Sequence, residues 1–562
     1  MPAPRIALAQ IDTCVGDVDA NAAAVLAWAR RAADEGADLV VFPEMTVTGY
    51  PIEDLALRAS FRRGAEAALQ RTAAELEAAG LGELAVLVGT VGERTLAPTG
   101  DQDAPQGARR PTNQAVLLQH GQVQARYDKH HLPNYGVFDE FRIFTPGDDL
   151  CVVDVRGRRV GVVVCEDIWQ DGGPVSQMDE AEVELLVVLN GSPYEEGKGH
   201  VRVELATRRA GEVRAPVAYV NLVGGQDDLV FDGGSFVVGV DGTVLASAPQ
   251  FVEHLLLWDL PERGAPPQPG ALAEPLSADE EVYRAIVLGL ADYVRKNGFR
   301  SVLLGLSGGI DSALTATIAA DAVGGQNVVG VSMPSAYSSE HSKDDAADLA
   351  KRLGADYRVQ PIGPIVEAFR GELEIEGVTE ENLQARVRGV LLMALSNREG
   401  HLVIAPGNKS ELATGYATIY DAGSIGGFAP LKDVDKSRVW ALARWRNNAA
   451  LDGVFGPDEL PPIPESSITK PPSAELRPGQ LDQDSLPPYA LLDEVLDAYV
   501  ENAEGRAELL ARGFDPAVVD KVLALVDRAE WKRRQYPLGP KVTALAFGRD
   551  RRLPVTTRWR EP

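Results

Sequence analysis

The stretch Ser307-Gly308-Gly309-Ile310-Asp311-Ser312 decides how this sequence is interpreted. The apolar run before it, 301–306, predicts a strand, and residues 313–322 predict a helix with Asp311 or Ser312 at its cap. A strand, a glycine turn and a helix N-terminus bind anions well, because free backbone N–H groups and the helix dipole both favour negative charge. The pattern GxxxxGK[ST] of a Walker A loop is missing, so an ordinary strand-to-helix turn is the alternative to a phosphate site.

Length and charge limit the classes of protein that the chain can belong to. Its 562 residues exceed what one hydrophobic core holds, which predicts two domains of about 250 to 300 residues. A net charge of −27 argues against nucleic-acid binding, because an acidic surface repels a phosphate backbone. The sequence has three cysteines, no apolar run long enough for a transmembrane helix and no signal-peptide pattern at its start. We therefore expect a cytoplasmic protein with neither a disulfide framework nor a membrane partner.

A proline-rich stretch divides the chain. Residues 261–277 carry five prolines, a composition that excludes a helix or a central strand and predicts a linker. We expect one domain over residues 1–260, where strands and helices alternate before a β-rich stretch. Asn21 is expected to cap the first, alanine-rich helix, which should run to about Glu35. A second domain is expected over residues 278–562.

Three polar residues lie at or just beyond the ends of predicted strands in the first domain: Glu44, Lys129 and Cys165. Together they are sufficient for amide hydrolysis, because a thiolate can attack a carbonyl group and form a thioester. The glutamate can take the thiol proton and later activate water, and the ammonium can stabilise the developing oxyanion. Taken singly, each residue has a plainer alternative, a buried core thiol or a solvated surface charge.

The sequence around these residues resembles the nitrilase, or carbon–nitrogen hydrolase, superfamily. The contexts are FPE, DKHHLPNYGVFDE and VVVCEDIW, and the likeness covers about residues 4–260. It implies a nitrilase-like α-β-β-α sandwich in which Glu44, Lys129 and Cys165 form the catalytic triad.

Within that superfamily, the stretches KHHLPNYGVFDE and NGSPY resemble the glutaminase domain of glutamine-dependent NAD+ synthetases. This likeness implies L-glutamine as a substrate, with contacts from Tyr135, Ser192, Lys198, Tyr50 and Glu166. A carboxylate such as Glu166 suits the α-ammonium group of an amino acid.

Glu140 and the two remaining cysteines need separate interpretation. Glu140 could orient Lys129, as a second carboxylate does in related amidases, or it could be a capping or surface glutamate; both readings stay open. Cys14 and Cys151 have no motif around them, and we interpret them as structural.

The second domain brings two carboxylates toward its phosphate loop. Strands predicted at 301–306 and 327–331 are separated by a helix, which predicts a parallel sheet whose ligands bind at the carboxyl ends of its strands. A third strand, 402–405, ends shortly before Glu411, so Asp311 and Glu411 can face the same phosphates. Carboxylate and phosphate oxygens suit Mg²⁺, which we expect at these two residues. The alternative for Glu411 is a first-turn helix glutamate favoured by the dipole.

The SGGIDS loop resembles that of the ATP pyrophosphatase superfamily, and longer stretches resemble the synthetase domain of glutamine-dependent NAD+ synthetases. These are NLQARVRG, GNKSELATGYAT, GGFAPLKDVDKSRVWALARWRN, ITKPPSAELRPGQLDQDSLPPY and FGRDRRLP. The likeness covers about residues 275–562 and implies a Rossmann-like doubly wound parallel sheet, with ATP as co-substrate and Mg²⁺ as cofactor. It implies ATP contacts from Gly305, Leu306, Ser307, Gly308, Gly309, Ile310, Asp311, Ser312, Pro406 and Lys436. It implies deamido-NAD contacts from Asn382, Arg386, Glu411 and Lys532.

The sequence departs from this family pattern at two places. It has Tyr420-Asp421-Ala422 where YGD is common, and Asp435 where DVPK has a proline, while Lys436 is kept. The stretch 471–488, rich in Pro, Gln and Asp, indicates either a disordered linker or a mobile loop that closes over the substrate and excludes water. We favour the loop, because predicted helices follow it.

The combined chemistry predicts ATP-dependent amidation of deamido-NAD to NAD+, with ammonia from L-glutamine, a Cys165 thioester and an adenylated intermediate. We expect a homo-oligomer, a dimer or higher. One rival is another ammonia-using pyrophosphatase, such as a GMP-synthetase-like enzyme, although such enzymes pair with a different glutaminase type. The other is a nucleotide sensor with degenerate sites, against which the intact Glu44, Lys129, Cys165, Asp311 and Glu411 argue.

Overall fold

The computed structural model describes residues 3–95, 109–449 and 460–561. The chain divides into two compact units, Met1–Gln226 with Phe231–Leu276, and Asp227–Val230 with Ser277–Pro562. Within the described ranges, no helix is both long and apolar enough to cross a membrane.

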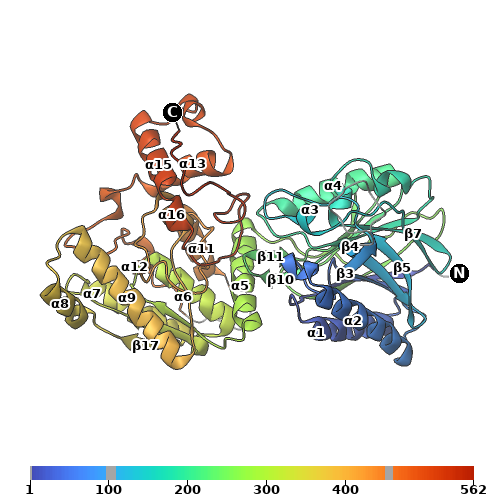
Figure 1. Cartoon of the computed structure of the whole chain (residues 1–562), viewed down its shortest axis with the longest axis horizontal. Coiled ribbons are helices and arrows are strands. Elements are labelled where there is room, and N and C mark those ends of the chain that lie inside the picture. Colours follow the sequence, from blue (N-terminus) through green and yellow to red (C-terminus); the bar gives the residue numbers. More distant parts are fainter. Residues whose placement is uncertain (1–2, 96–108, 450–459, 562) are drawn as a thin grey trace. The chain divides into compact units, whose positions relative to one another are not determined.

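The first unit contains two six-stranded sheets with helices on their outer faces (Figure 1). One sheet has the order β14-β1-β2-β3-β4-β5, and the other has the order β13-β12-β9-β8-β7-β6. Helix α2 packs on β3, β4 and β5, and α4 packs on β9 and β12. From residue 5 to residue 259 the elements are β1 (Arg5–Gln10), α1 (Val18–Asp34), β2 (Leu39–Val41), η1 (Glu53–Leu57), α2 (Ala59–Ala78), β3 (Ala85–Thr95), β4 (Arg109–Gln119), β5 (Gln122–Asp128), α3 (Glu140–Ile143), β6 (Val152–Val155), β7 (Arg158–Val164), η2 (Cys165–Ile168), η3 (Pro174–Gln177), β8 (Leu185–Asn190), α4 (Lys198–Val213), β9 (Val217–Asn221), β10 (Val223–Gln226), β11 (Leu229–Asp232), β12 (Phe236–Val238), β13 (Val244–Ser247) and β14 (His254–Asp259).

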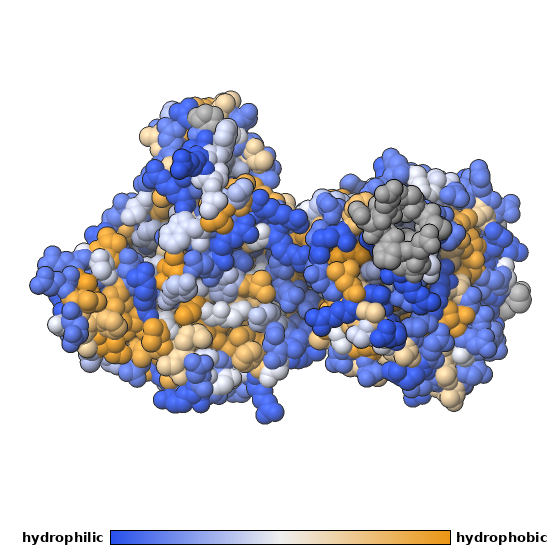
Figure 2. Space-filling view, viewed as in Figure 1, coloured by the Kyte–Doolittle hydropathy of each residue, from blue (hydrophilic) through white to orange (hydrophobic). Residues whose placement is uncertain are grey.

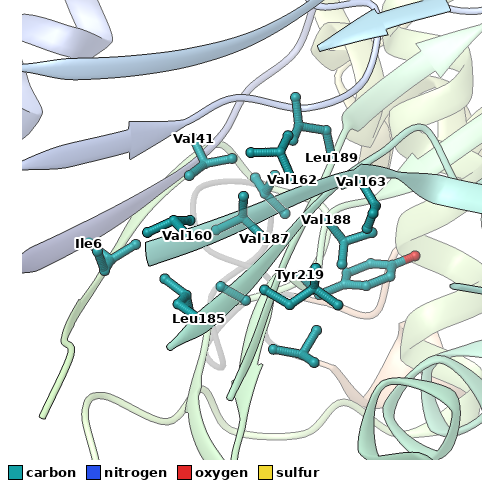
Figure 3. Packing of buried hydrophobic residues seen from close by; sticks show 14 of the residues in the cluster. Ile6, Val41, Val160, Val162, Val163, Leu185, Val187, Val188, Leu189 and Tyr219 are labelled. Atoms are coloured by element: carbon teal, nitrogen blue, oxygen red, sulfur yellow. The ribbon is translucent and has the colours of Figure 1, made fainter. Parts of the chain in front are cut away.

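The alternation of side chains between the two faces of each strand explains how the layers pack. In β1, Ile6 and Leu8 belong to the core that also holds Val160 and Val187 of the second sheet (Figure 3). The intervening alanines of β1 belong to a separate core with helices α1 and α2. Successive strand residues point to opposite faces, so a strand that is apolar at every position is buried on both faces. The four layers α-β-β-α follow from this pattern.

The start of α1 differs from our expectation that Asn21 caps it. Asp17 is the cap, and its side chain accepts a hydrogen bond from the backbone N–H of Ala20. Asn21 instead lies inside the helix, buried, and donates to the carbonyl oxygens of Cys14 and Val47. The capping residue was predicted wrongly because the Asn21 amide has partners outside its own helix.

The second unit is built on a four-stranded parallel sheet with the order β17-β16-β15-β18. Helices α6 and α7 pack on β16, while Leu303 and Val329 share a core with residues of α8 and α9. Helices therefore cover both faces, and the predicted doubly wound parallel sheet is confirmed. The elements are α5 (Ala278–Lys296), β15 (Val302–Gly305), α6 (Ile310–Val323), η4 (Gly325–Asn327), β16 (Val328–Ser332), α7 (Glu340–Leu353), β17 (Asp356–Val359), α8 (Gly363–Glu372), α9 (Val378–Glu399), β18 (Leu402–Val403), α10 (Lys409–Thr414), α11 (Lys436–Asn448), α12 (Glu465–Thr469), η5 (Asp482–Asp484), α13 (Tyr489–Leu496), η6 (Asp497–Glu501), α14 (Arg506–Ala511), α15 (Pro516–Arg528) and α16 (Glu530–Arg533).

Helix α6 begins earlier than predicted. Gly309 occupies the cap position, so neither Asp311 nor Ser312 caps the helix. The Ser312 hydroxyl donates to the carbonyl oxygen of Gly309 at 3.0 Å, and the Asp311 carboxylate accepts from Asn408 and Lys436. Both side chains are used for other contacts, which leaves the first N–H groups of α6 unprotected by a side-chain cap.

The proline-rich stretch 261–277 contains no helix or strand. Its backbone is tied to strand β13, because Gly270 N–H donates to the Leu245 carbonyl at 2.7 Å and Ala273 N–H donates to Ser247 Oγ at 3.0 Å. Residues 261–276 therefore run along the first unit.

Candidate functional sites

Glu44 and Lys129 form a buried ion pair at the end of the first sheet. Glu44 follows β2 and Lys129 follows β5, and Glu44 Oε1 lies 2.8 Å from Lys129 Nζ, with both side chains fully buried. Asn113 Nδ2 donates to Glu44 Oε1 at 2.6 Å, and the Gly191 N–H donates to Glu44 Oε2 at 2.8 Å. The carboxylate is thus held by three donors from three separate strands or strand ends.

Glu140 is the second carboxylate on the same ammonium. Its Oε2 accepts from Lys129 Nζ at 2.8 Å, and its Oε1 accepts from the Tyr50 hydroxyl at 2.9 Å. Burial, opposed by the charge of Lys129, raises the pKa of Glu140 to about 7. Burial alone would lower the pKa of the Lys129 ammonium, but Glu140 and Glu44 raise it well above its ordinary value. Glu140 therefore contacts Lys129 from inside the protein and is not a surface group.

Cys165 begins the short helix η2 directly after β7, with a φ of 42° that residues other than glycine rarely adopt. Burial raises the pKa of its thiol well above the ordinary value; the charge of Glu44 adds to this rise and that of Lys129 opposes it. The resting thiol therefore carries its proton at neutral pH. A neighbouring base is needed to make the thiolate, and among the nearby charges Glu44 raises the pKa of the thiol most.

A cavity of about 320 Å³ opens onto Cys165. Four of the five predicted glutamine contacts line it: Tyr135, Glu166, Ser192 and Lys198. Tyr50, the fifth, does not line the cavity; it lies buried with its hydroxyl on Glu140. The Tyr135 hydroxyl donates to Glu166 Oε2 at 3.0 Å. Lys198 is the first residue of α4 and lines the cavity beside Glu195 and Glu196, so this wall carries charges of both signs.

The second unit has its own cavity of about 320 Å³, at the carboxyl ends of β15 and β16. The predicted ATP contacts at Pro406 and Lys436 line it, as do all residues from 305 to 312 except Gly308. Gly308 has a φ of 75°, and a Cβ there would lie 2.3 Å from the carbonyl oxygen of Ser342. Glycine is thus required for the close approach of the loop to α7.

Asp311 and Glu411 converge on one lysine in this cavity. The Lys436 ammonium contacts the Asp311 carboxylate and lies 3.5 Å from Glu411 Oε1. Burial, opposed by Lys436 and assisted by the charge of Asp311, raises the pKa of Glu411 to about 8. Among the described residues, no three His, Cys, Asp or Glu side chains are grouped to hold a metal ion. Two carboxylates fit a hard cation such as Mg²⁺ only if phosphate or water oxygens complete its shell.

The predicted deamido-NAD contacts are divided between several places. Lys532 lines a small pocket and donates to the carbonyl oxygens of Gly415 and Ala417 at 2.7 and 2.8 Å. Asn382 Oδ1 accepts from the Thr418 hydroxyl at 2.7 Å, and Arg386 Nε donates to the Ile419 carbonyl at 3.2 Å. The segment 415–419 gathers these three side chains, although only Lys532 lines the pocket. Glu411 lines the phosphate-loop cavity instead.

Comparison with known proteins gives a clear result. The carbon–nitrogen hydrolase family model matches residues 5–265, and the NAD synthase family model matches residues 282–536. The chain is 44% identical to the glutamine-dependent NAD(+) synthetase of Acinetobacter baylyi, with 99% of each chain covered. It belongs to the glutamine-dependent NAD(+) synthetase family.

Further relatives agree with this membership. The chain is 46% identical to the glutamine-dependent NAD(+) synthetase of Xanthomonas campestris, covering 98% of this chain and 97% of the relative. A solved structure of the glutamine-dependent NAD+ synthetase from Acinetobacter baumannii in complex with adenosine diphosphate is 40% identical, with a TM-score of 0.75 and full coverage of both chains. The resemblance of both halves to this family, expected from their motifs, is confirmed.

The two departures from the family pattern have clear positions in the structure. Asp421 is half-buried in its turn, where its carboxylate accepts from the N–H groups of Thr418 and Gly423. Asp435 stands at the cap of α11 without a side-chain capping bond, and burial raises its pKa to about 7. Lys436, the first residue of α11, still reaches the phosphate-loop cavity.

Part of the predicted loop 471–488 is packed against the same cavity. Residues 471–476 and Asp482 line it. The Glu475 carboxylate accepts from the hydroxyls of Ser339 and Ser342 at 2.9 and 2.8 Å, at the start of α7. The segment therefore has specific contacts and does not have the character of a free linker.

Sequence reasoning missed three groups that support the candidate residues. Asn113 and the Gly191 N–H bind Glu44, and Asn408 Nδ2 donates to Asp311 Oδ1 at 2.9 Å. Only Asn408 has a local signal, since Asn-x-x-Glu before a helix is a capping pattern and its side chain accepts from the Glu411 N–H. The partners of Glu44 come from distant strands and have no such signal.

Proposed function

We propose that this member of the glutamine-dependent NAD(+) synthetase family converts deamido-NAD, ATP and L-glutamine into NAD+, AMP, pyrophosphate and glutamate. One observation carries the proposal: a single chain holds a cavity with a thiol beside a buried Glu–Lys pair and a second cavity with a phosphate loop. The first suits amide hydrolysis, and the second suits activation of a carboxylate by ATP. Neither chemistry alone makes an amide from glutamine nitrogen.

In the first cavity, Glu44 takes the proton of the Cys165 thiol, and the sulfur attacks the glutamine carboxamide. The Lys129 ammonium stabilises the oxyanion, and its own charge is fixed by Glu44 and Glu140 at 2.8 Å each. The C–N bond breaks, ammonia leaves with the proton from Glu44, and a thioester remains. Glu44 then activates water, which hydrolyses the thioester and frees the thiol.

Glutamine binding in this proposal uses the lining of the same cavity. Lys198, the first residue of α4, attracts the α-carboxylate, and Glu166 attracts the α-ammonium. Tyr135 holds Glu166 through its hydroxyl, and Ser192 contributes a further polar contact. Tyr50 acts from behind the triad, through Glu140.

In the second cavity, the carboxylate of deamido-NAD attacks the α-phosphorus of ATP and pyrophosphate leaves. Ammonia then attacks the resulting acyl adenylate and AMP leaves. The loop 305–312, Pro406 and Lys436 would bind ATP, while Asn382, Arg386, Glu411 and Lys532 would contact deamido-NAD. Asp311 and Glu411 would hold Mg²⁺, which neutralises the leaving phosphates when bound. The relative from Acinetobacter baumannii was solved in complex with adenosine diphosphate, which supports binding of an adenine nucleotide by this chain.

We further propose a cytoplasmic homo-oligomer with functional domains 1–260 and 278–562 joined by 261–277. Self-association is supported by exposed apolar side chains on β17, α8 and α9 and in the turn that follows α8, a region where Figure 2 shows hydrophobic surface. These are Val359, Phe369, Leu373, Val378 and Val390. Sedimentation velocity of the whole chain tests this, and a monomer at micromolar concentration would contradict it.

The decisive experiment is NAD+ formation from deamido-NAD, ATP and glutamine by the purified chain. Replacing deamido-NAD with XMP tests the GMP-synthetase-like alternative, and pyrophosphate release tests a sensor with degenerate sites. We expect NAD+ and pyrophosphate in equal amounts with deamido-NAD and no turnover with XMP. Absence of NAD+ with both glutamine and ammonium salts would refute the proposed function.

A further inference from the structure

Asp167 has a fully buried carboxylate that accepts four hydrogen bonds. Its Oδ1 accepts from the backbone N–H groups of His130 at 3.1 Å and His131 at 2.8 Å. Its Oδ2 accepts from the backbone N–H of Val164 at 2.9 Å and from the Tyr127 hydroxyl at 2.7 Å. The His131 ring is too far away to add a fifth bond, with Nδ1 at 3.8 Å from Oδ1.

The four donors belong to the two segments that carry Lys129 and Cys165. Tyr127 lies near the end of β5 and His130 follows Lys129 directly, while Val164 ends β7 and precedes Cys165 directly. Strands β5 and β7 belong to different sheets. One carboxylate therefore joins the two sheets at the place where the amine and the thiol come from.

We propose that Asp167 is a positioning residue that sets the Cys165 sulfur against the Lys129 ammonium, an inference that rests on the proposed glutamine hydrolysis. Lys129 is otherwise tied to its own surroundings, since its N–H donates to the Asn113 carbonyl at 2.8 Å and its carbonyl accepts from the Gly147 N–H at 2.9 Å. Cys165 has the strained φ of 42°, a conformation that persists only when neighbouring contacts hold it. The bond from Val164 N–H to Asp167 closes that turn.

Because Asp167 is buried, its carboxylate needs its hydrogen-bond donors to remain ionised. Burial raises the pKa of its carboxyl, and the N–H groups of His131 and Val164 and the Tyr127 hydroxyl oppose that rise. Asparagine has the same shape but only one accepting oxygen, and its second arm is an NH₂ donor. In one orientation that NH₂ faces the backbone N–H groups of His130 and His131, and in the other it faces the backbone N–H of Val164. Either way, one of the two segments loses its backbone hydrogen bonds to residue 167.

The test is the Asp167→Asn variant of the whole chain, with glutamate release as the readout. We expect kcat to fall about 10²-fold, because a misplacement of about 1 Å is enough for such a loss. KM for glutamine should stay within about threefold, since Tyr135, Ser192 and Lys198 are untouched. NAD+ synthesis from ammonium salts should be unchanged and reports a folded second unit. Wild-type kcat in this variant would overturn the inference.

A second measurement needs no glutamine and separates this inference from the proposed function. The rate at which iodoacetamide alkylates Cys165, followed on its own peptide, depends on how Lys129 and Glu44 face the thiol. We expect this rate to change at least about tenfold in Asp167→Asn. If wild type hydrolyses no glutamine, the proposed function fails while the alkylation rate still tests Asp167. Equal rates in the two proteins would overturn the positioning role.

Asp321→Asn is the matched control. Asp321 is a buried carboxylate of the second unit that accepts from the Tyr283 hydroxyl and the Arg446 guanidinium. The Asp321→Asn variant should keep both glutamate release and the rate of Cys165 alkylation within about twofold of wild type. If Asp167→Asn fails to fold, Asp167→Glu decides, because it keeps both acceptors but is one methylene longer. A folded Asp167→Glu protein with wild-type kcat would overturn the proposal.

Discussion

Lys129 donates a hydrogen bond of 2.8 Å to Glu140, and both side chains are buried. Glu44 binds the same ammonium at 2.8 Å, so one cation lies between two carboxylates. Burial, assisted by the like charge of Glu44 and opposed by Lys129, raises the pKa of Glu140 to about 7. Glutamine hydrolysis should therefore sense the ionisation of Glu140 near neutral pH.

The Glu140→Gln variant tests this pH dependence. Glu140 gains its proton below about pH 7, so wild-type kcat should fall as the pH drops through that value. The amide side chain at position 140 of the variant cannot ionise. We therefore expect kcat of the variant to show no fall near pH 7, and to be about tenfold below wild type at pH 8. The measurement is glutamate release from pH 6 to 9. If kcat of the variant still fell near pH 7 as in wild type, that fall would belong to another ionisable group.

Lys129→Ala should cripple glutamine hydrolysis while leaving the fold intact. The ammonium lies 2.8 Å from Glu44 and its charge acts on the Cys165 thiol, and loss of an oxyanion donor costs roughly 10²–10³ in rate. Glutamate release measures the effect, and circular dichroism with ammonium-driven synthesis provides the control. Near-normal glutamate release by the folded variant would refute the role given to Lys129.

Cys165→Ala should separate the two activities. Without the sulfur no thioester forms, so NAD+ synthesis from glutamine should vanish, whereas synthesis from ammonium salts should persist. The phosphate-loop cavity lies wholly within residues 305–536, and the substitution is small. Retained synthesis from glutamine would make Cys165 only a buried core thiol. Cys151→Ala, at another buried thiol of the same unit, is the matched control and should keep both activities.

Asp311→Asn or Glu411→Gln should abolish synthesis with either nitrogen source. The two carboxylates converge on Lys436 beside the phosphate loop, and losing a Mg²⁺ ligand removes several kcal/mol of stabilisation from the leaving pyrophosphate. Pyrophosphate release over a Mg²⁺ titration is the readout, and glutamate release by the first unit should continue. A variant with wild-type pyrophosphate release at saturating Mg²⁺ would exclude that residue as a metal ligand.

The sequence predicted helices, strands and the residues at strand ends better than it predicted the hydrogen-bond partners of side chains. Strand-to-helix turns at 301–312 were visible because apolar runs and glycines are local signals, and Cys165 stood out because its motif is contiguous. The caps at Asn21 and at Asp311 or Ser312 were wrong, because these side chains bind groups elsewhere in the fold.

Contacts between distant segments were beyond the reach of local patterns. Asp167 lies two residues after Cys165, yet nothing around it indicates that it binds the backbone beside Lys129. The predicted glutamine contact Tyr50 does not line the cavity, because its hydroxyl donates to Glu140 instead. No local pattern could indicate this bond, since Glu140 is 90 residues away along the chain. Pairings of this kind are set by how the sheets stack.

Gly308 bears on any attempt to transplant the phosphate loop. A Cβ at this position would meet the Ser342 carbonyl at 2.3 Å, so the loop takes its shape partly from the start of α7. The conformation of the six residues Ser307 to Ser312 therefore depends on a contact outside the hexapeptide. A designer who grafts them onto another strand-to-helix turn must also bring a helix whose first turn leaves room for a bare backbone, or the hexapeptide will adopt a different curve.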